Sequence, residues 1–87
     1  MDETRSTAGQ DAATEGAVLR RLLALHPAPA SFEELLREVA ADPGDFAQRD
    51  AVERAVGELA ASGLLNRSGE LLLPSRAAVR ADALLAS

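Results

Sequence analysis

Residues 48–74, QRDAVERAVGELAASGLLNRSGELLLP, contain the pattern of one helix, a glycine stop and a tight hairpin. Asp50 with Glu53 three residues later makes a capping box, which predicts the start of the helix. Gly63 is suited to the left-handed backbone that commonly follows a helix. The inward face of this helix is predicted from the apolar residues at helical spacing, which are Val52, Val56 and Leu59.

The predicted hairpin follows directly on the glycine. Residues 64–65 leave the helix as a strand, and residues 68–69, Ser-Gly, form a turn pair. The three leucines that come next return as the second strand, which a proline ends. Because side chains alternate along a strand, the middle leucine, Leu72, points outward if its two neighbours point inward.

The N-terminal region divides in two by composition. Residues 1–13 are polar and acidic without apolar periodicity, so we expect a disordered tail; the alternative is an arm that folds on a partner. From Thr14, which can cap a helix, residues 14–25 predict a first helix with a broad apolar face. This helix either crosses the core beneath the others or contributes part of its face to a subunit interface.

The middle of the chain contains a second capping box. Residues 27–30 alternate Pro and Ala and predict extended chain, after which Ser31 with Glu34 starts a helix over residues 32–41. An Asp-Pro-Gly turn then leads to the third helix, and we expect Phe46 to pin this loop to the core.

A fourth helix is predicted after the hairpin. Ser75 can cap a helix over residues 76–86. Its inward face is predicted from the apolar residues at helical spacing, which are Val79, Ala83 and Leu84.

The composition limits the classes of protein to which the chain can belong. Eighty-seven residues make one domain at most, and with 2% aromatic residues the core must be built from Leu, Val, Ala and two Phe. The formal net charge is −5: residues 1–15 carry four acids and one Arg, and the rest carries ten acids and eight Arg. The folded part is thus near neutral, whereas nucleic-acid-binding domains usually carry a basic excess.

The order helix, short strand, helix, helix, hairpin, helix over residues 14–86 resembles a winged helix-turn-helix domain. The resemblance is to the small domains common in bacterial transcription regulators, and the absence of Lys among nine basic residues is typical of a GC-rich bacterial genome. It implies an α+β fold, mostly helical, with a three-helix core, a short β-hairpin wing, and residues 14–87 as one domain. In such a fold residues 27–30 hold a first strand that joins the hairpin.

The resemblance also implies where DNA would bind, namely the third helix and the hairpin. The candidate contacts are Gln48, Arg49, Arg54, Arg67 and Arg76. The alternative for Arg54 is pairing with Asp50 or Glu58 on an ordinary solvent-exposed helix. We also expect Arg67 to pair with Glu70 across the hairpin.

The sequence favours a binding role over catalysis. It has one His, no Cys and no glycine-rich phosphate loop, so we expect no enzyme activity, no metal site and no cofactor. With no long apolar run we expect a cytoplasmic protein that does not enter a membrane. The expected partner is double-stranded DNA, as for a transcription regulator; the alternative is a protein-interaction or dimerisation module. Apolar residues near both chain ends, such as Leu85, favour a homodimer.

Overall fold

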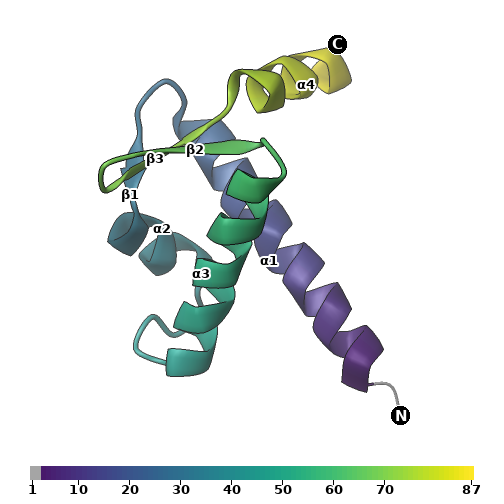
Figure 1. Ribbon diagram of the computed structural model, residues 1–87, viewed down its shortest axis with the longest axis vertical. Coiled ribbons are helices and arrows are strands. Elements are labelled where there is room, and N and C mark those ends of the chain that lie inside the picture. The colour runs from purple at the N-terminus through teal and green to yellow at the C-terminus, as the bar shows by residue number, and fades with distance from the viewer. Residues whose placement is uncertain (1–2) are drawn as a thin grey trace.

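The computed structural model describes residues 3–87, and their side chains from residue 9 onward. These residues form four helices and a small antiparallel sheet of strand order β1-β3-β2, which lies at one end of the body (Figure 1). The α+β, mostly helical prediction is therefore confirmed. In chain order the elements are α1 (Glu3–Leu25), β1 (Ala30–Ser31), α2 (Phe32–Val39), α3 (Phe46–Ala61), β2 (Leu65–Ser68), β3 (Leu71–Pro74) and α4 (Arg76–Ala86).

Helix α1 begins well before its predicted start. Residues 3–13, for which the sequence predicts a disordered tail, belong to this helix; residues 1–2 lie outside the described part. Thr14 does not cap the helix, because its hydroxyl donates to the carbonyl oxygen of Gln10 one turn earlier, at 2.9 Å. The physical reason is that nucleation is the costly step of helix formation, and extension from a segment anchored by buried Val18 and Leu22 is cheap.

Helix α2 starts as its sequence predicts. The hydroxyl of Ser31 accepts a hydrogen bond from the Glu34 amide at 3.1 Å, and the Ser31 amide donates to Oε1 of Glu34 at 2.9 Å. This reciprocal pair satisfies two amides at the helix start and confirms the capping box. The helix then buries Leu35 and Leu36.

Helix α3 starts earlier than predicted. Asp45 is the N-cap and accepts from the Ala47 amide at 3.0 Å, so the capping box expected at Asp50 is wrong. Phe46 consequently occupies the exposed first turn, with 82% of its surface accessible, and does not pin the loop to the core. The earlier cap and the exposed Phe46 have one cause. The Asp-Pro-Gly turn places Asp45 directly before α3, next to the first backbone amides of the helix, which have no acceptor within the helix.

The end of α3 follows the sequence prediction. Gly63 has a φ of +82°. The Gly63 amide donates to the Ala60 carbonyl at 3.1 Å, and the Leu64 amide donates to the Leu59 carbonyl at 2.9 Å. These two bonds are the pair that defines a Schellman motif, which fixes the direction in which the chain leaves toward β2.

The hairpin forms with its turn one residue later than predicted. Ser68 pairs with Leu71, so Gly69, with a φ of +63°, and Glu70 make the turn. Arg67 therefore stands opposite Leu72, and its predicted pairing with Glu70 is wrong. The orientation of the leucines is also reversed, because Leu72 is buried and Leu71 is 42% exposed.

A short first strand joins this hairpin, as the resemblance implied, but it is Ala30–Ser31, so only Ala30 of the predicted residues 27–30 belongs to it. Ala30 pairs with Leu72 and Ser31 with Leu71, so β3 lies between β1 and β2. This pairing places the start of α2 beside the hairpin. It is also the reason that Leu72, on the central strand, faces inward.

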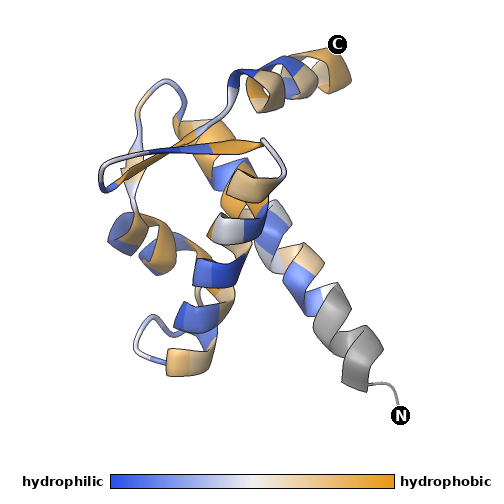
Figure 2. Ribbon diagram, in the orientation of Figure 1, coloured by the Kyte–Doolittle hydropathy of each residue, from blue (hydrophilic) through white to orange (hydrophobic). Residues whose placement is uncertain are grey.

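One apolar core joins the first three helices to the sheet, and orange segments of each face it in Figure 2. Its largest members include Val18, Leu22, Leu35, Leu36, Val52, Val56, Leu59, Leu65 and Leu72. Helix α4 contributes little, since Ala78 is its one buried residue. The predicted inward residues Ala83 and Leu84 are exposed instead, because the helix projects beyond the body (Figure 1).

Candidate interaction surface

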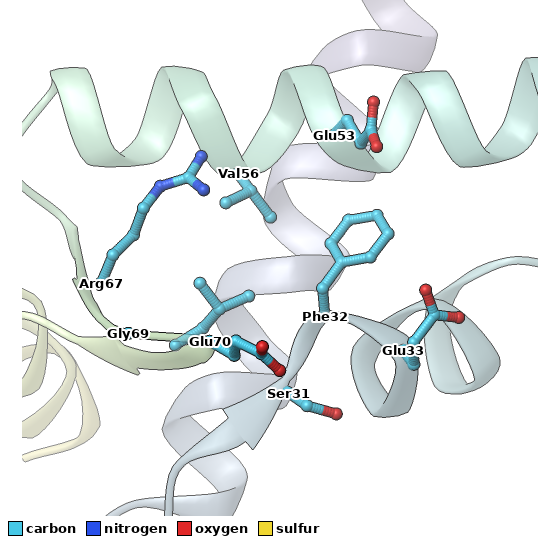
Figure 3. Close-up of a pocket in the computed structure, with 9 residues that line it drawn as sticks. Ser31, Phe32, Glu33, Glu53, Val56, Arg67, Gly69 and Glu70 are labelled. Carbon is cyan, nitrogen blue, oxygen red and sulfur yellow. The ribbon is translucent and has the colours of Figure 1, made fainter.

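A groove lies between α3, the start of α2 and the hairpin (Figure 3). Its volume is about 490 Å³. Its apolar side is formed by Phe32, Val56 and Leu72, of which the last two are buried. Its polar and charged lining consists of Ser31, Glu33, Glu53, Arg67 and Glu70.

Pairing of β1 with β3 creates this groove. The register that sets Ser31 opposite Leu71 brings the first turn of α2 to the tip of the hairpin. Helix α3 closes the other side, and in Figure 3 the Phe32 ring and the Arg67 side chain both extend toward it. The groove therefore depends on three segments that are distant in sequence.

Arg49, one of the predicted DNA contacts, is held by α2. Its Nη2 atom lies 2.5 Å from Oε2 of Glu33, and its guanidinium carbon lies 5.2 Å from the centroid of the Phe32 ring. The hydrogen bond from Arg49 lowers the pKa of Glu33, and the same bond raises the pKa of Arg49. The guanidinium thus has a carboxylate and an aromatic face as partners within the chain.

Arg54, another predicted contact on α3, is paired with α1. Its Nη2 atom lies 3.6 Å from Oδ1 of Asp11, and both side chains remain largely exposed. The partners expected from sequence were Asp50 or Glu58 on the same helix. Asp11 was missed because it belongs to the segment that was predicted to be disordered.

Gln48, in the first turn of α3, forms hydrogen bonds with the loop that precedes this helix. Its Oε1 accepts from the Asp42 amide at 2.9 Å, and its Nε2 donates to Oδ2 of Asp45 at 3.3 Å. Both the oxygen and the nitrogen of the side-chain amide are therefore hydrogen-bonded. This arrangement replaces the loop-pinning role that was predicted for Phe46.

The other two candidates lie apart from each other. Arg67 is exposed on β2 and lines the groove. Arg76 is in the first turn of α4 and lines a separate hollow with His26 and Arg80. The five predicted DNA contacts are therefore spread over the first turn of α3, both sides of α3, the hairpin and α4.

Sequence reasoning missed the acidic lining of the groove. Glu70 was assigned to a pair with Arg67, and no role was predicted for Glu33. Glu53 was assigned a capping role at the start of α3. Their shared location follows from the sheet register, for which a single sequence contains no clear signal.

Two further observations concern the described residues 3–87. Among the side chains that the structure describes, from residue 9 onward, no three His, Cys, Asp or Glu gather in a way that could hold a metal ion. None of the described helices combines the length and the apolar character needed to cross a membrane.

Comparison of the chain with protein-family models, curated proteins and solved structures found no match.

Proposed function

We propose that this chain is a winged-helix domain that works as a protein–protein interaction module. The fold assignment is supported by the element order α1-β1-α2-α3-β2-β3 and by the sheet order β1-β3-β2. In a winged helix α3 is the recognition helix and the hairpin is the wing. Fold alone does not decide what such a domain binds, so the function is argued from the surface of these elements.

The single observation that carries the proposal is the intramolecular pairing of both α3 arginines. Arg49 is paired with Glu33, and Arg54 with Asp11. The exposed side of α3 retains three further acids, Asp50, Glu53 and Glu58. Phosphate contacts require an excess of positive charge, and this surface does not provide one.

DNA binding is the second candidate function, as in a bacterial transcription regulator. It is favoured by Arg67 and Arg76, which are exposed and take part in none of the ion pairs between described side chains. Arg67 is on the hairpin, where a wing reaches the backbone of a duplex. Two separated cations supply few phosphate contacts, so we rank this function second.

A salt series with a labelled random duplex distinguishes the two functions. We expect no binding even at low salt, for the wild-type chain and for Arg67→Ala alike. Binding that weakens by about one log unit per log unit of salt for each phosphate contact would favour DNA as the partner. Loss of that binding in Arg67→Ala, with retention in the surface control Arg20→Ala, would establish the hairpin as the contact.

A homodimer formed through α4 is part of the proposal. Leu84 and Leu85 are 57% and 87% exposed, and the preceding turns add exposed Ala77 and Ala81 on the same side of the helix. A helix of 11 residues with one buried residue gains stability from a partner. A second copy offers the same apolar surface, as two-fold pairing requires.

A further inference from the structure

The groove between α3 and the hairpin combines apolar, acidic and basic side chains within one small volume. Phe32, Val56 and Leu72 give it an apolar side. Glu53 and Glu70 add carboxylates from two different elements. Neither forms an ion pair with another described side chain, whereas Glu33 is already bound to Arg49.

We propose that this groove binds a short segment of a partner protein in which an apolar side chain is adjacent to an Arg or Lys. The inference rests on the proposed interaction function and names the site and the partner chemistry. The apolar side chain would cover Phe32, which is only partly buried. Glu53 and Glu70 lie on opposite sides of the Phe32 ring (Figure 3), so the cation would bind one of these two carboxylates and form charge-assisted hydrogen bonds with it.

Arg67 adds a polar donor to the same site. It extends from β2 toward α3 beside Val56 (Figure 3). A guanidinium at this position can donate to backbone carbonyl oxygens of a bound segment. A volume of about 490 Å³ suits a few side chains, since ligand sites typically measure about 300–1,000 Å³.

The combination of groups favours a peptide over other ligands. A nucleic-acid backbone would bring phosphates to Glu53 and Glu70, and like charges repel. A simple cation would leave the apolar side and Arg67 without contacts. A peptide segment supplies an apolar side chain, a cationic side chain and carbonyl acceptors together, and so matches every part of the lining.

A display experiment tests the proposal. The full chain is immobilised and a random heptapeptide library is selected against it, and enriched peptides are then synthesised with a fluorescent label. We expect enrichment of sequences with Arg or Lys next to a large apolar residue. We also expect the double variant Glu53→Gln, Glu70→Gln to weaken binding of these peptides by roughly tenfold or more, as lost charge-assisted bonds imply.

The matched control is Asp50→Asn, Glu58→Gln, which removes two carboxylates of α3 that do not line the groove. This control should bind the same peptides unchanged, and circular dichroism should show both double variants folded. Enriched peptides without basic residues, or binding unaffected in the Glu53, Glu70 variant, would overturn the groove assignment and leave the interaction function standing. A library that yields no binder would count against both.

Discussion

The guanidinium of Arg49, on α3, lies 5.2 Å from the centroid of the Phe32 ring, on α2. This contact joins α3 to α2, and Glu33 completes it as an ion pair. It also covers one face of the ring that lines the groove. Arg49 is therefore a structural residue here, although its type and position predicted a role in binding DNA.

Removal of this contact should weaken the domain slightly. We expect Arg49→Ala to lower the melting temperature by a small, measurable amount, because the pair is solvent-exposed and water screens it. Arg49→Lys should lower it as well, since an ammonium does not stack on a ring as a guanidinium does. Thermal unfolding is measured for each single variant and for the double variant Arg49→Ala, Phe32→Leu. Fully additive effects of Arg49→Ala and Phe32→Leu on the melting temperature would contradict the contact.

Leu72 should be the critical leucine of the hairpin. It is buried at the centre of the sheet, so Leu72→Ala should reduce the free energy of unfolding by about 2–5 kcal/mol. Leu71→Ala, on the exposed face of the same strand, is the matched control and should change it far less. Urea unfolding monitored by circular dichroism compares the two, and equal losses would mean that the strand register is different.

The N-cap of α3 should be Asp45, and Asp50 should not matter for helix initiation. Asp45→Ala removes the acceptor of the Ala47 amide and should cost about 0.5–2 kcal/mol. Asp50→Ala, within the helix and exposed, should change stability by less than about 0.5 kcal/mol. Urea midpoints of both variants decide between the two caps, and a larger loss at Asp50 would restore the shorter helix.

Two glutamates at the start of α2 should make stability fall in acid. The hydrogen bond from Arg49 lowers the pKa of Glu33, and the Ser31 amide lowers the pKa of Glu34. A carboxyl with a depressed pKa in the folded state contributes stability above its ordinary pKa of about 4.3. That contribution is lost as pH falls through the folded-state value.

Urea midpoints from pH 7 down to pH 3 measure this effect. The double variant Glu33→Gln, Glu34→Gln keeps one side-chain oxygen at each position but cannot titrate, so its midpoint should depend less on pH below about 4.3. Glu58→Gln, an exposed glutamate outside both contacts, is the control. A double variant that retains the full acid dependence would show that other groups cause it.

The proposed dimer through α4 should depend on Leu85. Sedimentation equilibrium over a wide concentration range should give a dimer mass for the wild-type chain and a monomer mass for Leu85→Glu. Leu71→Glu, an exposed leucine of the hairpin, tests whether the interface extends beyond the helix. A wild-type chain that stays monomeric to high micromolar concentration would exclude this interface. Leu72→Glu is no test of association, because it would disrupt the core.

The sequence by itself determined the features that depend on residues close in the chain. Ser31 with Glu34 and the lone Ser75 each start the helix that was predicted from them. Gly63 ends α3 because its left-handed φ is unfavourable for any residue with a Cβ. These signals involve backbone groups within a few residues, so no knowledge of the rest of the fold is needed.

Tertiary structure decided the features for which the local sequence allows more than one arrangement. Asp45 and Asp50 are both acceptable caps, and the turn around Gly44 selects the first. Either face of the leucine strand could point inward, and pairing of Ala30 with Leu72 selects one. The partners of Arg49 and Arg54 come from α2 and α1, which are distant from α3 in the chain. The sequence alone does not indicate which residues of these helices lie next to the two arginines. Since the groove and its charge depend on these long-range contacts, the candidate site became visible only in the folded chain.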